Sequence, residues 1–428
     1  MAAIDSGVSQ ADFANLLKFG APPAETNRVL NVVRIHLGMD VAFISRFGDV
    51  ARVLDHVVGG EGCPLVPGQS IPLEEGYCLK IIRGELPQLI PDTAQVPATQ
   101  DIPATHLIPI GAHLSVPIRL ENGELYGTLC CFNRKPIPSL GPEDLRLLRV
   151  LSDVLAANID RAREEEAALY AKHSQIQGLI ANAAVNTVYQ PIYTIASGRL
   201  QGFECLSRFP TMSPPDPEPW FKNARAVGLL DALQMHAIEI ALAPALADRS
   251  DIRLNINGSP ELIVSGKLMA LLKSTGFRHV TVEITEHDEI LEYAPVIDAV
   301  AELRSQGAKL AIDDAGAGIS SMRHILLLKP DVVKLDASIV RGVDHDTARQ
   351  SLIHGLVRFC HHLGSTVTAE GVETRAELLA LGELHVDQAQ GMYLGVPRSL
   401  DDVLARSGAG VEQLTEVLRP HRQPDTGD

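Results

Sequence analysis

Five short apolar runs in the second half of the chain each end in carboxylate, amide or ammonium side chains. Runs of this length, rich in Val, Ile, Leu and Thr and separated by helix-length segments, are typical of buried parallel strands in repeated β/α units. Barrels of such units carry their chemistry at the carboxyl ends of the strands, so these polar residues are candidates for one site. A structural cap would explain one polar residue, but not polar groups on all five strands. The runs are Arg253-Leu-Asn-Ile-Asn257, Val280-Thr-Val-Glu-Ile-Thr-Glu286, Leu310-Ala-Ile-Asp-Asp314, Val332-Val-Lys-Leu-Asp336 and Thr366-Val-Thr-Ala-Glu370.

The chemistry of these strand ends points to divalent metal ions. Mg²⁺ and Mn²⁺ prefer oxygen ligands, which carboxylates and the carbonyl of an asparagine supply. Two such ions about 4 Å apart can activate a shared water and neutralise the nonbridging oxygens of a phosphodiester. The pattern therefore indicates a metal-dependent phosphodiesterase.

The segment from about Asn186 to Pro397 resembles the EAL-domain phosphodiesterases, which hydrolyse cyclic di-GMP. The resemblance implies an α/β TIM-like (β/α)8 barrel that converts cyclic di-GMP to linear pGpG. Its motifs occur in the family's order: Tyr189-Gln-Pro-Ile192, Gly202-Phe-Glu-Cys-Leu-Ser-Arg208, Asn257-Gly-Ser-Pro260, Glu283-Ile-Thr-Glu286, Asp313-Asp-Ala-Gly-Ala-Gly318, Lys334-Leu-Asp336, Ala369-Glu-Gly-Val-Glu-Thr374 and Gln390-Gly391.

The same resemblance implies roles for individual residues. Asp313 would bridge two Mg²⁺ or Mn²⁺ ions, and Lys334 would contact the attacking water, with Glu204 and Glu370 beside it in catalysis. Lys334 could equally balance the surplus carboxylates by a salt bridge, and the two roles are compatible. The metal ligands would be Glu204, Asn257, Glu283, Asp313, Asp314 and Glu370. The residues organising substrate would be Gln190, Arg208 and Gln390, and Glu286 would order the loop that follows Asp314.

The chain departs from the family's pattern at a few positions next to these residues. They are Cys205, Ala315, Ala317, Ile319 and Arg225, and the sequence leaves their effect open. No expected metal ligand is missing, which favours the enzyme over two alternatives. One alternative is a noncatalytic receptor that binds cyclic di-GMP and signals by contact, and the other is a dimeric signalling scaffold with a vestigial barrel.

Residues 24–165 read as a first domain of the α+β class. Strands are expected at 41–45, 113–118 and 125–132, between flanking helices at 24–37 and 142–161. The segment resembles a GAF sensory domain, a family that binds small ligands or dimerises. Leu79 follows Cys78 where bilin-attaching relatives have histidine, so a bilin is disfavoured, and an unknown small ligand is left open. The motifs are Ile71-Pro-Leu-Glu-Glu-Gly-Tyr-Cys78, Leu86-Pro-Gln-Leu-Ile-Pro-Asp92, Gly111-Ala-His-Leu-Ser-Val-Pro117 and Gly127.

An amphipathic helix is expected to join the two domains. Its stripe, at three- and four-residue steps, is Leu145, Leu148, Leu151, Leu155 and Ile159, and we expect the helix to continue to about Ala184. The stripe either covers its own domain or also forms a two-stranded coiled coil. We expect a homodimer whose activity depends on the state of the GAF domain. The expected parts are 24–165, a helical linker at 166–185, a phosphodiesterase domain at 186–410 and a tail at 411–428.

Composition limits the remaining function classes. The chain has 428 residues, more than one core usually organises, and a net charge of −16, which argues against DNA or RNA polymers as partners. There is no apolar run near eighteen residues and no signal-like start, so we expect a cytoplasmic protein without a membrane partner. The six cysteines lack C-x-x-C spacing, which disfavours structural zinc. Cys130 and Cys131 should face opposite sides of a strand.

Overall fold

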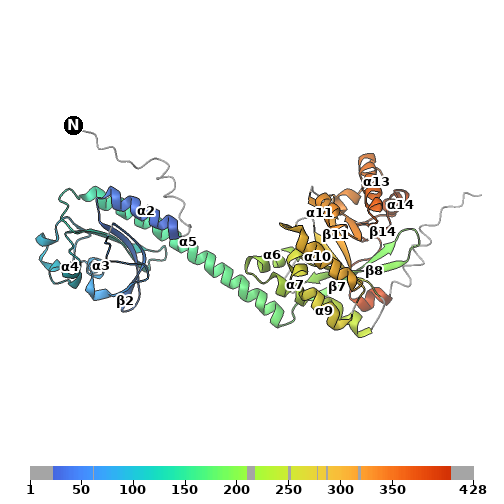
Figure 1. Cartoon of the computed structure of the whole chain (residues 1–428), viewed down its shortest axis with the longest axis horizontal. Coiled ribbons are helices and arrows are strands. Elements are labelled where there is room, and N and C mark those ends of the chain that lie inside the picture. The colour runs from blue at the N-terminus through green and yellow to red at the C-terminus, as the bar shows by residue number, and fades with distance from the viewer. Residues whose placement is uncertain are drawn as a thin grey trace, which may run out of the picture. The chain divides into compact units, whose positions relative to one another are not determined.

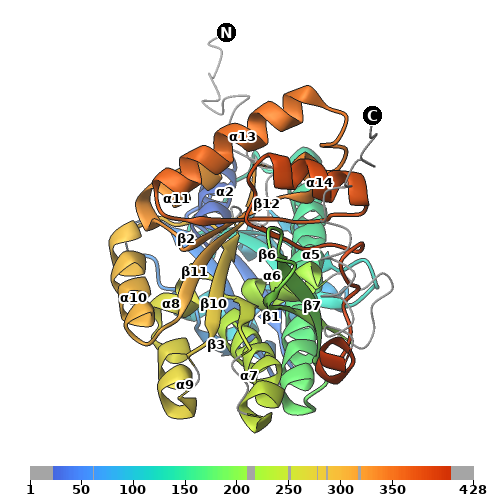
Figure 2. The ribbon, with the colours of Figure 1, turned by 90° about the vertical axis from the view of Figure 1, so that its right-hand side faces the viewer.

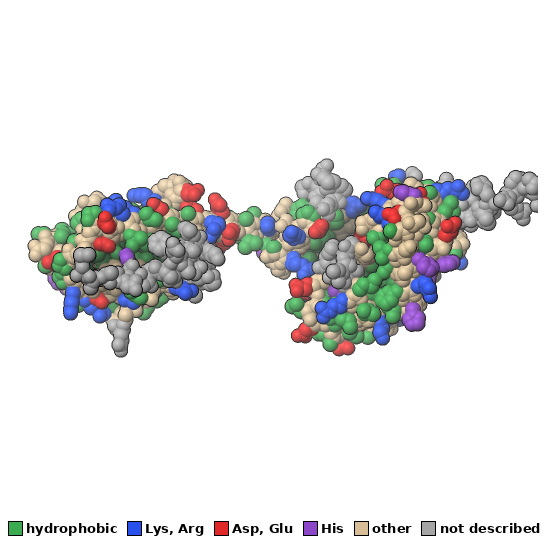
Figure 3. Space-filling model, turned by 90° about the horizontal axis from the view of Figure 1, so that it is seen from above, with side chains coloured by type: hydrophobic (Ala, Val, Ile, Leu, Met, Phe, Trp, Pro, Cys, Tyr) green, Lys and Arg blue, Asp and Glu red, His purple; other side chains and the backbone are tan. Residues whose placement is uncertain are grey.

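The computed structural model of the chain describes residues 23–60, 62–209, 217–248, 252–276, 278–285, 288–316 and 320–405. The chain divides into two compact units, Met1–Ala168 and Leu169–Asp428 (Figure 1). Within the described ranges, no helix has the length and apolar character needed to cross a membrane. Acidic, basic and apolar side chains are interspersed on the face of each unit drawn in Figure 3.

The N-terminal unit is built on a six-stranded antiparallel sheet with the strand order β3-β2-β1-β6-β5-β4. Its helices are α2 (Pro23–His36), α3 (Tyr77–Ile82), α4 (Pro103–Leu107) and the first part of α5 (Pro142–Ala181), with short 3-10 turns at Leu73–Glu75, Thr93–Gln95 and Pro97–Thr99. The strands are β1 (Val41–Phe47), β2 (Ala51–Gly59), β3 (Ser70–Pro72), β4 (Leu89–Ile90), β5 (Ala112–Arg119) and β6 (Leu125–Asn133). The expected α+β class is confirmed.

The two faces of this sheet carry separate apolar clusters, because successive side chains of a strand point to opposite sides. Ile44 and Cys131 belong to the cluster that includes α2 and α5 residues. Phe43 and Cys130 belong to the cluster that includes α3 residues. The prediction that Cys130 and Cys131 face opposite sides is confirmed.

Helix α5 is one continuous helix, as the amphipathic stripe predicted. All five stripe residues pack in or against the apolar cluster of the N-terminal unit, so the stripe covers its own domain. The last turns of α5 belong to the C-terminal unit, where Ile176 and Leu179 are buried in a cluster with Phe209 and Trp220. Between these two packed stretches, Leu169 and Tyr170 are exposed.

The C-terminal unit is a closed barrel with the strand order β10-β11-β12-β13-β14-β7-β8-β9. The five apolar runs of the sequence are β9 to β13, and they pair in parallel as predicted. The strands are β7 (Asn186–Thr194), β8 (Leu200–Arg208), β9 (Leu254–Asn257), β10 (Val280–Thr285), β11 (Lys309–Ala315), β12 (Val332–Leu335), β13 (Thr366–Ala369) and β14 (Gln388–Ala389).

Strand β7 differs from a regular (β/α)8 barrel because it runs antiparallel to both of its neighbours, β8 and β14. The connection from Thr194 to Leu200 is a short turn in which Gly198 has a φ of +63°. Parallel strands need a crossover of a dozen or more residues, so this short turn permits only a hairpin. The fold is therefore a TIM-like barrel that opens with one reversed strand.

Helices surround the barrel strands (Figure 2). The barrel core is aliphatic, and Val282, Ile312, Val333 and Val367 are buried. This packing fixes the strands and brings their carboxyl ends to one rim. The helices are α6 (Glu218–Ala226), α7 (Leu230–Asp248), α8 (Pro260–Val264), α9 (Lys267–Thr275), α10 (Tyr293–Ser305), α11 (Ser320–Leu328), α12 (Ala337–Val340), α13 (Thr347–His362) and α14 (Arg375–Glu383).

Candidate metal centre

A buried lysine lies at the middle of the barrel's carboxyl end. Lys334 of β12 is fully buried, and its Nζ faces four carboxylates from four different strand ends. The distances from Nζ are 2.6 Å to Glu370 Oε1, 2.9 Å to Glu283 Oε2, 3.1 Å to Asp313 Oδ1 and 3.4 Å to Glu204 Oε2. The structure thus brings these five predicted site residues together.

Strand register explains why these side chains meet. In the parallel ladder, Glu204 of β8 is level with Asn255 of β9, and Glu283 of β10 is level with Asn257. Glu370 directly follows β13. Side chains at matching levels on the inner face of a barrel are neighbours.

The charges of this cluster do not balance, because four carboxylates face one ammonium group. Burial raises the pKa of Glu283 to about 8, and the nearby Glu204 and Asp313 charges add to the rise against the opposing effect of Lys334. Burial and the charge on Asp313 also raise the pKa of Glu370 well above its ordinary value. Burial lowers the pKa of Lys334, but the surrounding carboxylates outweigh burial and hold it well above its usual range. Further positive charge would stabilise the ionised carboxylates.

The oxygen atoms of the cluster form two acidic groups that could hold metal ions. Glu204, Glu283 and Asp313 make one group, in which the ligand atoms lie within 4.8 Å of one another. Asp313 makes a second group of the same dimensions with Asp314 and Glu370. Because both groups consist of carboxylates and share Asp313, the residues present fit a pair of hard divalent cations.

The backbone at Asp314 makes the second group possible. In a regular strand, Asp313 and Asp314 would point to opposite faces. Asp314 instead has a φ of +57°, in the left-handed region, which aspartate tolerates better than most residues. The bend allows consecutive carboxylates to contribute oxygen atoms to one group.

Two glutamines position Glu204. Gln390 Nε2 donates to Glu204 Oε2 at 2.5 Å and to Gln190 Oε1 at 3.0 Å, and Gln190 Nε2 donates to the Gly395 carbonyl at 3.0 Å. Gln390 Oε1 is buried without a hydrogen-bond partner in the described part of the chain. The structure therefore places both predicted glutamines at the acidic cluster.

Of the remaining predicted residues, Asn257 and Arg208 lie near this cluster. Asn257 ends β9 and is exposed beside Glu283. Arg208 ends β8 and is half-buried, with Nη1 donating to the Ser207 carbonyl at 2.9 Å. Burial lowers the pKa of Arg208, while Glu204 opposes that effect. Glu286 lies outside the described residues, as do Ala317 and Ile319.

One residue that contacts the acidic cluster was not predicted from the sequence. Asn255 is buried, and its Nδ2 donates to Glu283 Oε1 at 2.8 Å, on the carboxylate whose other oxygen faces Lys334. Asn255 lies two residues before Asn257 and so shares a strand face with it. That spacing could have placed Asn255 on the same face as Asn257, but not its contact with Glu283, which depends on the strand register.

A cavity of about 470 Å³ opens beside the acidic cluster. Asn257 and Glu283 form part of its wall, together with Phe221 and Gln234. Arg225, at one of the departures from the family pattern, lines the same cavity and pairs with Glu261 at 2.8 Å and Asp288 at 3.3 Å. The cavity therefore reaches the candidate metal centre at Asn257 and Glu283.

Comparison with known proteins decides the family. The sequence model of the EAL domain matches residues 173–397, more than half of the chain. This chain belongs to the EAL domain family. The sequence model of the GAF domain matches residues 24–159, so a GAF domain precedes the EAL domain. Both resemblances drawn from the sequence motifs are confirmed.

Relatives of this EAL protein include an uncharacterized protein of Azorhizobium caulinodans, 30% identical over 248 residues that cover 53% of this chain and 34% of that protein. The cyclic di-GMP phosphodiesterase NbdA of Pseudomonas aeruginosa is 27% identical over 248 residues, covering 55% of this chain and 30% of NbdA. The chain thus spans about a third of the length of these relatives.

A solved structure supports the fold. The EAL enzyme Bd1971, in a form bound to cAMP and cyclic di-GMP, matches with a TM-score of 0.52 and 16% identity. The match covers 88% of this chain and 93% of that chain. At this level of identity, the likeness concerns the fold alone.

Proposed function

We propose that this chain hydrolyses cyclic di-GMP to linear pGpG with two divalent metal ions, Mg²⁺ or Mn²⁺. The observation that carries the proposal is the pair of acidic groups that share Asp313, with Lys334 Nζ 3.1 Å from that residue. Membership of the EAL family and the name of the Pseudomonas relative support the choice of substrate.

The chain supplies ligands for both ions. Glu204, Asn257, Glu283 and Asp313 would hold one ion, and Asp313, Asp314 and Glu370 would hold the other. When bound, such ions lower the pKa of a shared water and neutralise charge on the nonbridging phosphate oxygens. Asn255 would keep Glu283 in place for its part in this set, as outer hydrogen bonds do in metal sites.

Lys334 would act on the attacking water. A buried ammonium donates strong hydrogen bonds and favours the anionic form of a water next to it. Lys334 and Glu370 approach each other to 2.6 Å, so a water held there would meet both a hydrogen-bond donor and a proton acceptor. Glu204, held by Gln390, would complete the catalytic set.

Residues next to the candidate metal centre would contact the substrate. Arg208 has the planar fork that matches a phosphate. Gln190 and Gln390 would organise the substrate and its water. The cavity beside Asn257 would take part of the dinucleotide, with Phe221 as an apolar surface for a base.

We also propose that the GAF domain regulates the EAL domain and that the chain forms a homodimer. Helix α5 contributes buried residues to both units. A conformational change in the first unit could therefore be transmitted to the second through this continuous helix. The stripe covers its own domain, so a partner helix would use other α5 residues, such as the exposed Leu169 and Tyr170.

The experiment that tests this function is incubation of the purified full chain with cyclic di-GMP and Mn²⁺, followed by chromatography of the products. Appearance of pGpG supports the enzyme. Tight binding of cyclic di-GMP without any product would establish the alternative, a noncatalytic receptor, and absence of both binding and product would leave only a scaffold role.

A further inference from the structure

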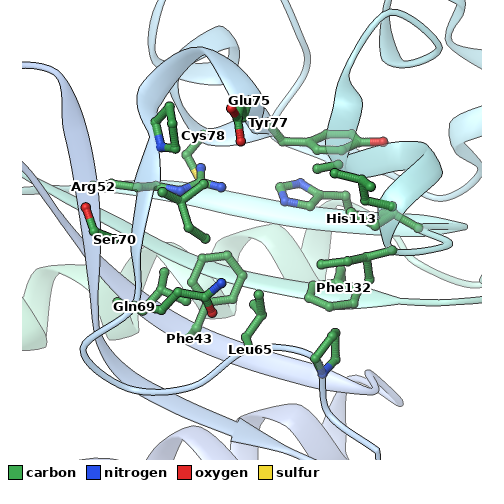
Figure 4. A pocket seen from close by; sticks show the side chains of 18 residues that line it. Phe43, Arg52, Leu65, Gln69, Ser70, Glu75, Tyr77, Cys78, His113 and Phe132 are labelled. Carbon is green, nitrogen blue, oxygen red and sulfur yellow. The ribbon is translucent and has the colours of Figure 1, made fainter.

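The GAF domain contains a second cavity, of about 270 Å³, whose walls are mostly apolar (Figure 4). It lies on the α3 side of the sheet, in the apolar cluster that contains Phe43, Phe132 and Tyr77. In Figure 4, Phe43, Leu65 and Phe132 lie on one side of the Arg52 guanidinium, and Cys78 lies on the other. The mechanism proposed for the EAL domain makes no use of this cavity.

Arg52 brings a buried charge into this apolar site. In β2, Arg52 and Leu54 share the inward face, and Arg52 is only 6% exposed. Its register partners are the apolar Phe47 on one side and Ile71 on the other. Its Nε and Nη1 are buried, and neither has a hydrogen-bond partner in the described residues.

An unpaired buried guanidinium is costly, because the desolvation penalty of the charge is not repaid by hydrogen bonds. Arginine cannot escape this penalty by losing its proton. Buried arginines are therefore normally paired, and a guanidinium that lines a cavity without a partner calls for an anion in that cavity. A second orphan atom lies in the same wall, because His113 Nδ1 is buried and has no partner within the described chain.

We propose that the GAF cavity binds a small organic carboxylate, with its carboxylate on Arg52 and its apolar part against Phe43 and Phe132. The planar guanidinium fork matches the two oxygens of a carboxylate. His113 would contribute one ring nitrogen to the same ligand. This inference stands apart from the proposed function of the EAL domain.

The charges of the wall favour a monoanion over a phosphate dianion, and the size of the cavity disfavours a nucleotide. Arg52 is the only Lys or Arg among the described residues of the wall, and Glu75 lies at the same wall. Burial lowers the pKa of His113 to about 3, and the Arg52 charge adds to the effect, so His113 is neutral at pH 7. A singly charged group balances one guanidinium, whereas a phosphate dianion would meet too little positive charge. The cavity is also smaller than the roughly 300–1,000 Å³ typical of sites for drug-sized ligands.

Gly76 holds the guanidinium at its position. A Cβ atom at Gly76 would lie 2.2 Å from Arg52 Nη2 and 2.6 Å from Cζ, so the guanidinium packs directly on this glycine. Besides the Glu75 carboxylate, Cys78 is a group of the described wall that could compete with an anionic ligand for Arg52. Its pKa falls to about 6, chiefly through the hydrogen bond with Cys130 at 3.2 Å and also through the Arg52 charge.

Calorimetry on the purified full chain tests the proposal with three carboxylates and their amides. The probes are benzoate, phenylacetate and 3-methylbutanoate, with benzamide, phenylacetamide and 3-methylbutanamide as neutral matches of nearly equal shape. We expect at least one carboxylate to bind at least tenfold more tightly than its amide. Inorganic phosphate and cyclic AMP should not displace it.

Substitution of the arginine separates ligand binding from a structural role. Arg52→Met keeps the apolar stem and removes the unpaired charge, so carboxylate binding should fall at least tenfold while the thermal midpoint of the ligand-free chain stays equal or rises. If Arg52 instead stabilised the fold, Arg52→Met would lower the thermal midpoint. Arg83→Met, at an exposed arginine paired with Glu74, is the matched control and should change neither quantity.

Four results would overturn the proposal. The first is that no carboxylate in the panel binds more tightly than its amide. The second is that Arg52→Met binds the carboxylate as the intact chain does. The third is that cyclic AMP binds the cavity more tightly than any carboxylate. The fourth is that only the Cys78→Ala variant binds carboxylate, because the Cys78 thiolate would then be the partner of Arg52.

Discussion

The Lys334 ammonium, which is fully buried among the strand ends of the barrel, lies 2.6 Å from the partly exposed Glu370 carboxylate. This contact joins the cation of the candidate centre to the acidic group that Glu370 forms with Asp313 and Asp314. The Lys334 side chain therefore stabilises the carboxylate cluster and also takes part in the chemistry proposed for it.

Replacing this lysine should affect turnover and stability in a metal-dependent way. Lys334→Met leaves four carboxylates without their ammonium, so the metal-free chain should lose about 3–5 kcal/mol of unfolding free energy, the usual cost of breaking a buried pair. Added Mn²⁺ should restore part of that loss. The variant should also lower kcat with little change in KM, measured by pGpG formation. Lys273→Met, at an exposed lysine paired with Glu302, is the control, and a Lys334 variant that changed only KM would contradict the assigned role.

Asn255 should control the affinity of the centre for metal. Asn255→Leu fills the same space but leaves Glu283 Oε1 without its hydrogen bond, so Mn²⁺ affinity should fall about 10- to 100-fold, as for other outer contacts of metal ligands. Titration calorimetry with Mn²⁺ measures the change. Asn182→Leu, at an exposed residue near the end of α5, should leave the affinity unchanged, and equal affinities for all three chains would remove Asn255 from the site.

The sequence predicted the barrel strands well and the details of the site less well. Runs β9 to β13 are readable because both faces of a parallel strand are buried, which gives a continuous apolar run, and polar residues mark the end of each run. The reversed direction of β7 depends on the short turn before Leu200, which no apolar pattern reveals. The role of Asn255 depends on the register between β9 and β10, and the burial of Arg52 depends on which face of β2 meets α3. Neither the strand register nor the packing of β2 against α3 can be read from the local sequence.

Acid should destabilise the GAF domain through His113. The pKa of His113 falls to about 3 in the folded chain, chiefly through burial, so below its ordinary pKa of 6.5 only the unfolded chain takes up the proton. Stability is therefore lost as the pH falls, by about 2 kcal/mol between pH 8 and pH 5. His113→Phe keeps the ring packing on Tyr77 and should lose less stability over this interval. Hydrogen exchange of β5 amides measures the difference.

The control for this pH dependence is His106→Phe, at an exposed histidine of α4. Its stability should fall with pH as in the intact chain. If the intact chain and His113→Phe lost the same stability between pH 8 and pH 5, His113 would not be the group responsible.

The start of a functional EAL fragment should lie within α5. Ile176 and Leu179 are buried with Trp220, so a fragment from residue 169 should fold, whereas a fragment from residue 186 lacks this packing and should be less stable by several kcal/mol. Urea unfolding followed by fluorescence reports this region, because Trp220 is the single tryptophan of the chain. Equal stability of the two fragments would contradict the packing described for α5.

The fragment from residue 169 also tests regulation by the GAF domain. Its hydrolysis rate should differ from that of the full chain at equal Mn²⁺ concentration. Its mass in solution should correspond to a monomer, whereas that of the full chain should correspond to a dimer. If the fragment and the full chain hydrolysed cyclic di-GMP at equal rates, both with and without the small carboxylates, regulation by the GAF domain would be contradicted. A monomeric full chain would contradict the proposed homodimer.

The central claim is that two metal ions share Asp313, and the hydrolysis rate of Asp313→Ala tests it most directly. Loss of the shared ligand disrupts both acidic groups at once. We predict that pGpG formation at saturating Mn²⁺ falls at least 1,000-fold, in line with about 4 kcal/mol of lost transition-state stabilisation, while the barrel stays folded. Asp298→Ala, at an exposed residue of α10, should retain the full rate. A rate for Asp313→Ala within threefold of the intact chain would contradict the account.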